Sequence, residues 1–335
     1  MHGGRSARAG GASQRARVGW LALAGLALAA CSERVAEPLP DGGDAGAQPS
    51  HVIDAGEPAE AGSDASIDAL APMPDDFEPM VDERVCPPDM AKVARSFCVD
   101  RYEASLVDAE TGEELSPYYV PSRPQALSIE KFWQEERLRV GPPDAREIPL
   151  PPLPGFQRTR SFEPRAVSRR GRVPQGYLTG PLAALACKNA KKRLCTIDEW
   201  RVACRGDKDR RFPYGDTYEP GKCNIFREAH PAAILHGNAS IGHSDPRLNM
   251  VKAGDKPLLR RTGEARACAS TWEGDGIADM VGNVDEWVDD PEGTFMGGFY
   301  ARAKKDGCDS TIRAHAFDYF DYSTGVRCCA DLPPR

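Results

Sequence analysis

The stretch IADMVGNVDEWVDD, residues 277–290, decides how the rest of this chain is interpreted. Its centre is the pair Gly282-Asn283, which is typical of a tight turn because both residue types tolerate positive φ angles. Glu286 and Trp287 follow the turn, so a carboxylate and a large aromatic ring lie next to each other just after it. We expect Trp287 to pack inside the domain. The polar groups either bind a ligand or only shape the loop.

An amphipathic helix is predicted in GPLAALACKNAKK, residues 180–192. Pro181 occupies the first helical position, where its missing N–H costs no hydrogen bond. The residues on the inward face of this helix are expected to be Leu182, Ala183, Ala186 and Cys187.

A second helix is predicted in TIDEWRVACRG, residues 196–206. Thr196 and Glu199 have the spacing of a capping box, and the glycine at the end stops the helix. Cys204 shares a face with Trp200, so its sulfur is expected to point inward and to serve as a cross-link.

The rest of the C-terminal domain reads as short strands and loops. Residues 86–105 predict a strand pair, and the Pro-rich residues 117–174 contain a single helical pattern at 129–138. After Arg205 the chain is rich in loops. Neither the dinucleotide nor the P-loop glycine motif occurs in the sequence, which leaves nucleotide enzymes of those classes unsupported.

The N-terminus reads as an export signal. Four arginines precede GWLALAGLALAAC, residues 19–31, which is shorter than the roughly 20 apolar residues that span a membrane. Leu28–Cys31 resembles the bacterial lipobox, which implies cleavage before Cys31 and lipidation of that cysteine. Ser32 then points to the outer membrane, on its periplasmic side or at the cell surface. An ordinary signal peptide cut near Ala30 is the alternative.

Residues 32–85 are predicted to be a flexible acidic tether. They hold 14 Asp or Glu against two Arg, a net charge of −12, with few apolar residues to bury. A partner-binding acidic tail is the alternative. The whole chain carries −7 and the first 31 residues +4, so residues 86–335 carry about +1. Such a balance gives no indication of nucleic-acid binding.

Ten of the eleven cysteines lie in residues 86–335, which we treat as one domain. An even number in an exported domain favours disulfides, because the compartment is oxidising. Metal binding is the alternative, but the usual zinc spacings are absent. His230, His236 and His243 cluster in one polar segment at spacings of six and seven residues, which gives weak support for a metal site.

Six blocks in order resemble the formylglycine-generating enzyme, or sulfatase-modifying factor, domain. The blocks are KKRLCTIDEWRVACRG, FPYGD, CNIF, IADMVGNVDEWVDD, GG and GVRCCAD, from residue 191 to residue 331. The resemblance covers residues 86–335 and is strong only from Leu185 onward. It implies an irregular α+β fold of the C-type-lectin-like kind. It also implies calcium sites, with Asn283, the Val284 carbonyl and Glu286 as one candidate set and Asn224 with the Ile225 carbonyl as the second.

The family's copper chemistry implies two cysteines five residues apart, since soft thiolates suit Cu(I). In this chain those positions fall on Arg302 and Gly307, one residue before Cys308. Met296 and Phe299 replace further motif residues. A cation and a glycine make no two-thiolate site, so we expect no copper and name no catalytic residue.

The resemblance also implies disulfide partners. Cys308 aligns with a structural cysteine that pairs with Cys204, and a second family pair is Cys187–Cys328. The neighbouring residues then suggest Cys195–Cys329. The remaining cysteines leave Cys223–Cys268 and Cys86–Cys98.

Two functions follow from these observations. The first is a non-catalytic binding or structural module, tethered to the outer membrane, with an unknown protein or glycan ligand. The second is an oxidase that converts a substrate cysteine of sulfatase-like proteins to formylglycine. An iron oxidase built on the three histidines is a weaker option. An acidic-aromatic loop, 318–322, with Arg302, Lys304, Lys305 and Arg313 either lines a ligand groove or is an ordinary solvated loop.

Overall fold

The computed structural model describes residues 84–302 and 306–334. Outside the described residues lie the predicted signal peptide with Cys31, nearly all of the predicted tether, Lys304 and Lys305. None of the described helices is long and apolar enough to cross a membrane.

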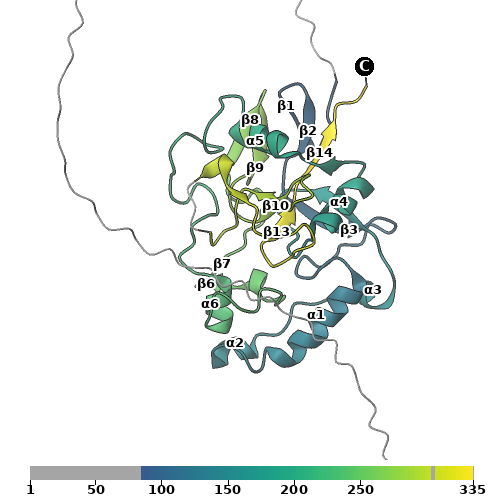
Figure 1. Cartoon of the computed structure of the whole chain (residues 1–335), viewed down its shortest axis with the longest axis vertical. Coiled ribbons are helices and arrows are strands. Elements are labelled where there is room, and N and C mark those ends of the chain that lie inside the picture. The colour runs from purple at the N-terminus through teal and green to yellow at the C-terminus, as the bar shows by residue number, and fades with distance from the viewer. Residues whose placement is uncertain (1–83, 303–305, 335) are drawn as a thin grey trace, which may run out of the picture. The chain divides into compact units, whose positions relative to one another are not determined.

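Two four-stranded sheets, one antiparallel and one mixed, organise the domain (Figure 1). The first sheet is antiparallel, in the order β1 (Met90–Val93), β2 (Phe97–Asp100), β14 (Cys328–Asp331), β5 (Arg193–Leu194). The second has the order β12 (Thr311–Ile312), β11 (Phe295–Met296), β10 (Asp285–Trp287), β13 (Thr324–Val326), and β10 and β13 run parallel. Strands far apart in the sequence therefore become neighbours, so that the C-terminal strand β14 closes on β2.

Three two-stranded ladders and a set of short helices surround these sheets. The ladders are β3 (Ala104–Asp108) with β4 (Pro164–Ser168), β6 (Lys252–Ala253) with β7 (Lys256–Pro257), and β8 (Ala269–Trp272) with β9 (Asp275–Ala278). The helices are α1 (Arg123–Glu136), α2 (Pro143–Glu147), α3 (Gly155–Thr159), α4 (Gly180–Asn189), α5 (Ile197–Arg205) and α6 (Pro231–His236), with single 3-10 turns at Leu248–Met250 and Gly307–Asp309.

The predicted helices are present at α4 and α5. The capping box of α5 is complete, since Thr196 and Glu199 each bind the other's backbone N–H. Thr179 caps α4 by accepting a bond from the Leu182 N–H, a cap that the sequence analysis missed. The Pro-rich region was underestimated: α1 begins at Arg123, and α2, α3 and β4 follow it. Prolines at the start of α1 and α2 initiate these helices instead of breaking them.

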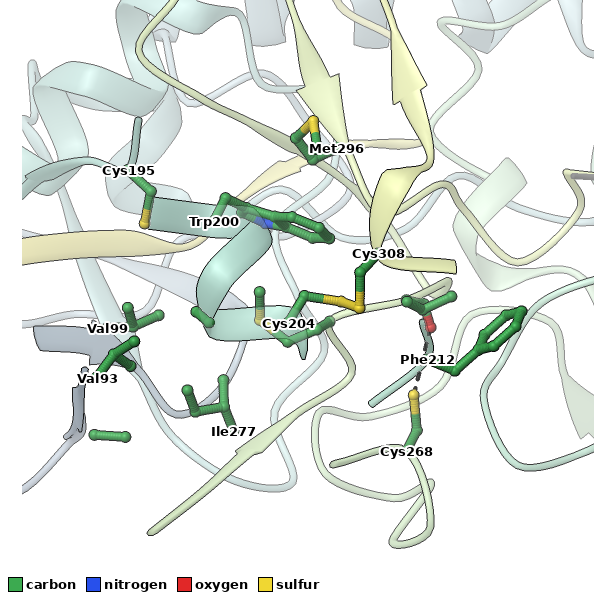
Figure 2. Close-up of a cluster of buried hydrophobic side chains, with 14 of the residues drawn as sticks. Val93, Val99, Cys195, Trp200, Cys204, Phe212, Cys268, Ile277, Met296 and Cys308 are labelled. Atoms are coloured by element: carbon green, nitrogen blue, oxygen red, sulfur yellow. Dashed lines mark hydrogen bonds between the residues drawn. A yellow bond between two sulfur atoms is a disulfide. The ribbon is translucent and has the colours of Figure 1, made fainter. Parts of the chain in front are cut away.

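The main core packs around Trp200, which is fully buried with Cys204, Phe212 and Met296 (Figure 2). A second cluster packs around Trp287, whose ring meets Phe295 edge to face. Both tryptophans follow an Asp-Glu pair in the sequence, and each lies at the centre of one of the two hydrophobic clusters. Trp287 packs inward as expected.

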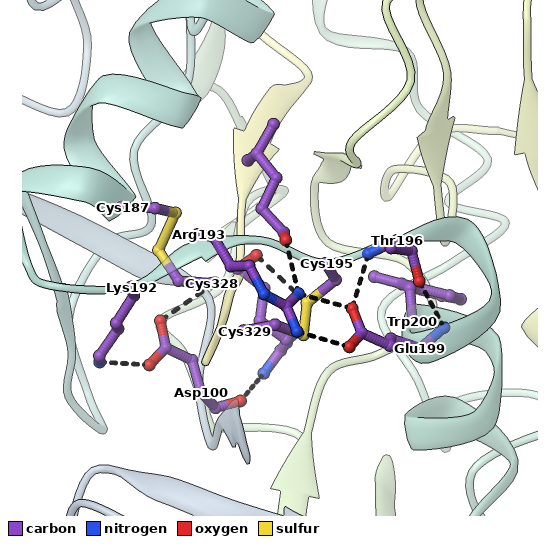
Figure 3. Close-up of a disulfide and its surroundings, with 12 residues drawn as sticks. Asp100, Cys187, Lys192, Arg193, Cys195, Thr196, Glu199, Trp200, Cys328 and Cys329 are labelled. Atoms are coloured by element: carbon purple, nitrogen blue, oxygen red, sulfur yellow. Dashed lines mark hydrogen bonds and ion pairs between the residues drawn. A yellow bond between two sulfur atoms is a disulfide. The ribbon is translucent and has the colours of Figure 1, made fainter. Parts of the chain in front are cut away.

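Five disulfides connect these parts. The pairs are Cys86–Cys98, Cys187–Cys328, Cys195–Cys329, Cys204–Cys308 and Cys223–Cys268, the same pairs that the sequence analysis names. Two adjacent cysteines of β14 bind the end of α4 and the residue after β5 (Figure 3). The long-range bonds close loops of 104 to 141 residues, which restricts the unfolded chain most strongly.

Candidate functional site

The Gly282-Asn283 turn brings the two asparagine motifs into contact. Gly282 has φ +85°, and a Cβ there would lie 2.3 Å from the carbonyl oxygen of Asn224, so only glycine fits. Asn283 follows at φ 64°, and its N–H donates to the same carbonyl at 2.9 Å. The turn predicted from sequence therefore exists because another chain segment passes directly against it.

The amide oxygens of both asparagines face protein donors. The Asn283 Oδ1 accepts from the Asn224 Nδ2 at 2.8 Å and from the Arg260 N–H at 3.0 Å. The Asn224 Oδ1 accepts from the Arg227 Nε at 2.9 Å, and its Nδ2 also donates to the Leu258 carbonyl. Since backbone groups fix both amide orientations, neither oxygen is directed towards a space where a cation would lie.

Glu286, the third side chain of the predicted calcium set, has different partners. Its carboxylate accepts from the Trp200 Nε1 at 2.6 Å and from the Arg327 Nη2 at 2.9 Å, and both charged groups are buried. The three side chains therefore do not converge as part of the six to eight oxygens that calcium needs. In this arrangement the side chains of Asn224, Asn283 and Glu286 do not fit a calcium ion. Within the described chain no group of three His, Cys, Asp or Glu side chains could hold a metal.

Glu103 is a residue that the sequence analysis missed. Its carboxyl group is buried beside the turn, where it accepts from the Asn283 Nδ2 at 2.7 Å and from the Val284 N–H at 3.2 Å. Burial, with the nearby carboxylates of Asp279 and Glu286, raises the pKa of Glu103 well above its ordinary value. No local sequence signal could reveal it, because it lies 180 positions from its partner.

The positions of the family's copper cysteines hold no thiol. Arg302 donates from its Nη2 to the Asp285 Oδ2 at 2.6 Å, and its guanidinium lies 5.1 Å from the centre of the Phe299 ring. A Cβ at Gly307 would lie 2.2 Å from the Arg211 carbonyl oxygen, so no larger residue fits there. Cys308 is bonded to Cys204 in the core (Figure 2).

A buried polar cluster surrounds Asp285, and we call it the Asp285 cluster: Asp285, Arg302, Tyr319, Asp321 and Ser323. Ser323 Oγ lies 2.7 Å from the Asp321 Oδ1 and 3.3 Å from the Asp285 Oδ2. Tyr319 donates its hydroxyl to the Asp321 Oδ2 at 2.7 Å. Burial raises the pKa of Asp285 to about 7, and the Arg302 charge only partly offsets this. The cluster therefore contains a carboxyl group that exchanges its proton near neutral pH.

The acidic-aromatic loop contributes to this cluster and is only partly solvated. Asp321 and Tyr322 are buried, whereas Asp318 and Arg313 are exposed. Of the four predicted cations, Arg302 alone is described in contact with the cluster.

The three histidines do not converge on a common point. His236 is buried, with its ring nitrogens facing the Ile241 carbonyl and the Asp245 carboxylate. His230 accepts the Ala232 N–H on its Nδ1 and faces the Tyr322 hydroxyl, while the ring of His243 faces the Ala239 carbonyl. The geometry therefore gives no support to an iron site at these side chains.

Comparison with known proteins agrees with this architecture. Residues 175–330 match the family described as Sulfatase-modifying factor enzyme 1-like domain. That part of the chain belongs to this family. The whole domain has the predicted α+β fold of the C-type-lectin-like kind, with little regular structure and five disulfides. No curated protein sequence matches the chain.

Several solved structures are similar over most of the chain. They include "Crystal Structure of CarF" (13% identity, 75% of this chain and 95% of that chain, TM-score 0.34), "Major Tropism Determinant U1 Variant" (12% identity, 75% and 55%, TM-score 0.37) and "Structure of PvdO from Pseudomonas aeruginosa" (15% identity, 70% and 80%, TM-score 0.32).

Proposed function

We propose that the chain is a binding or structural module that keeps the frame of the sulfatase-modifying factor domain without its copper-dependent oxidation. The observation that carries this proposal is that no free thiol occurs among the described residues and that neither copper position holds a cysteine. All ten cysteines among the described residues are in disulfides. Arg302 fills one copper position with a charge paired to Asp285, and Gly307 has no room for a side chain at the other.

The five disulfides are also consistent with the proposed export. Such bonds persist in oxidising compartments, and they match a lipoprotein anchored through Cys31 at the outer membrane. Replacing Cys31 with Ser is expected to move the protein from the membrane fraction to the soluble fraction. A membrane-bound Cys31→Ser protein would contradict the anchor.

A thiol count on the purified protein tests the loss of the oxidase. Under denaturing, non-reducing conditions, no residue of the domain is expected to react with a thiol reagent, and Cu(I) is expected to bind only weakly. A formylglycine assay on a cysteine-containing peptide is expected to show no product with added copper. Two reactive thiols with tight Cu(I) binding would support the oxidase instead.

The ligand of such a module would be a protein or a glycan. Loops held on a rigid, cross-linked frame are suited to binding, because the frame limits the entropy lost on association. A glycan array with and without calcium is the first screen for the Asp285 cluster, and Arg302→Met is the variant expected to lose any ligand found there. A ligand that binds Arg302→Met unchanged would place the site elsewhere.

A further inference from the structure

A cavity of about 460 Å³ opens beside β4, apart from the Asp285 cluster. One wall is Arg165–Ser168 of β4 with Arg169. The others come from Pro87, Asp89 and Met90, from residues 190–192 after helix α4, and from Ala330. We call it the β4 groove. None of its lining residues belongs to the Asp285 cluster or to the copper positions.

The β4 groove carries unbalanced positive charge. Arg165, Arg169 and Lys191 line it, and none of the three forms an ion pair with any residue in 84–302 or 306–334. Lys192 is different, since its Nζ binds the Asp89 carboxylate at 2.6 Å and the Asp100 carboxylate at 2.5 Å. The one carboxylate in the lining, Asp89, is thus already engaged, and the other cations remain available to an anionic ligand.

The wall formed by β4 is the edge of a two-stranded sheet, and some of its backbone N–H and C=O groups point into the groove. In its antiparallel ladder with β3, Ser105 faces Val167 and Val107 faces Arg165. On its other side β3 pairs with residue 114, through the bridge Val107–Glu114, and there the Leu115 N–H donates to the Leu106 carbonyl. The backbone groups of Leu106 therefore point away from β4, and those of Ser105 and Val107 point towards it. Val167 and Arg165 therefore bond to β3, whereas Ala166 and Ser168 point their N–H and C=O groups away from it.

These outward groups of β4 have no backbone partner in the described chain. The sheet order ends at β4, and neither the Ala166 nor the Ser168 backbone is bonded to another described residue. The Pro164 carbonyl, at the start of the strand, is already bound by the Asn189 Nδ2 at 2.8 Å. Ala166 and Ser168 are themselves only 3% and 4% exposed, so a ligand reaches their outward groups only through the β4 groove, where an unpaired strand edge is the usual platform for an added strand.

We propose that the β4 groove binds an extended acidic peptide segment of a partner protein, which adds as a strand to the free edge of β4. Backbone hydrogen bonds to Ala166 and Ser168 align the peptide. Its carboxylates meet Arg165, Arg169 and Lys191, and arginine suits carboxylates because its fork can bind both oxygens. The proposal goes beyond the loss of copper chemistry and does not depend on it, since the two sites share no residue.

The test is fluorescence anisotropy on the full chain with a labelled short peptide of alternating Glu and Val. Arg165→Glu with Arg169→Glu is expected to weaken binding at least about tenfold, because it reverses two charges in the groove. The matched control reverses Lys252 and Lys256, exposed cations of the β6–β7 ladder, and is expected to bind as the native chain does. Hydrogen exchange at residues 164–169 is expected to slow when the peptide binds.

Two further probes separate a strand from simple charge attraction. A peptide with alternating backbone amides methylated keeps its charges but cannot form the ladder, so it is expected to lose most of its affinity. A peptide of alternating Lys and Val is expected not to bind. Three results would overturn the proposal. The methylated peptide could bind as tightly as the unmethylated one, the Arg165→Glu/Arg169→Glu variant could bind as tightly as the Lys252/Lys256 control, or hydrogen exchange at residues 164–169 could stay unchanged.

Discussion

The guanidinium of Arg302 lies 2.6 Å from the carboxylate of Asp285, and the carboxyl group is fully buried. In the family pattern the first of these positions belongs to a copper thiolate. An arginine there stabilises the charged form of a carboxyl group whose pKa burial raises to about 7. Arg302 and Asp285 therefore form a partly buried ion pair whose strength depends on pH.

Replacing Arg302 with Met should destabilise the protein in a pH-dependent way. Removing one partner of a buried pair leaves the other charge uncompensated, which costs about 3 kcal/mol near pH 8. Near pH 5 Asp285 holds a proton, so the loss should be smaller. Urea unfolding at both pH values measures this, with the exposed Arg313→Met as control. An equal loss at both pH values would contradict the coupling.

The stability of the native protein should fall as the pH rises from about 4 to about 7. Burial raises the folded pKa of Asp285 to about 7 and those of Asp100 and Asp279 to about 6, from 3.8. The folded state therefore binds more protons than the unfolded state in this window, and raising the pH favours unfolding. Each unit of pKa difference contributes about 1.4 kcal/mol.

Urea midpoints across that pH range measure the effect. Asp285→Asn should flatten the profile, whereas the exposed Asp318→Asn should leave its slope unchanged. Below about pH 4 the opposite trend is expected. Asp245 and Glu199 have lowered pKa values despite burial, because hydrogen bonds and charges of His236, Arg247 and Arg193 favour their ionised forms. A midpoint that rises steadily from pH 4 to 8 would refute the assignment.

The Cys204–Cys308 bond should contribute more stability than the Cys86–Cys98 bond. The first joins residues 104 positions apart and the second residues 12 apart. Loop-closure entropy then predicts losses of about 5 and about 3 kcal/mol when each pair is changed to Ser. Calorimetry on the two double variants compares them. A larger loss for the short loop would show that local strain or packing dominates.

Glu286→Gln should destabilise the core strongly. The buried Arg327 would keep two backbone acceptors, the carbonyls of Asp100 and Ala278, but lose its counter-charge, at a cost of about 3 to 5 kcal/mol. Glu273→Gln is the matched control, because that residue pairs with Arg95 on the surface. The control should cost less than about 1 kcal/mol. Similar midpoints for the two variants in chemical unfolding would contradict a structural role for the buried pair.

Calcium should leave the melting temperature unchanged. The side-chain oxygens of Asn283 and Asn224 accept protein hydrogen bonds, and Glu286 is paired with Arg327. Scanning calorimetry in excess EDTA and in excess calcium measures this. A ligand that binds only the folded state would raise the melting temperature with its concentration, and such a rise would restore the calcium hypothesis.

Local features followed directly from local sequence. The capping box of α5 needs only Thr196 and Glu199, three positions apart, and the turn at Gly282 needs a residue that accepts positive φ. The order of the six blocks was sufficient to predict the family and the fold. By contrast, the prolines in the first turns of α1 and α2 give an ambiguous local signal, because Pro interrupts regular structure in loops and also starts helices.

The sequence by itself determined the helices with complete caps, the Gly282 turn, the even supply of cysteines and the family of the domain. Tertiary structure alone decided what the polar residues do. It brought three pairs into hydrogen-bond contact: Glu103 with Asn283, Arg302 with Asp285, and Arg327 with Glu286. The partners are 17 to 180 positions apart in the sequence. Capping and turn geometry are short-range, whereas burial, ion pairing and the pKa values they set depend on which distant segments meet.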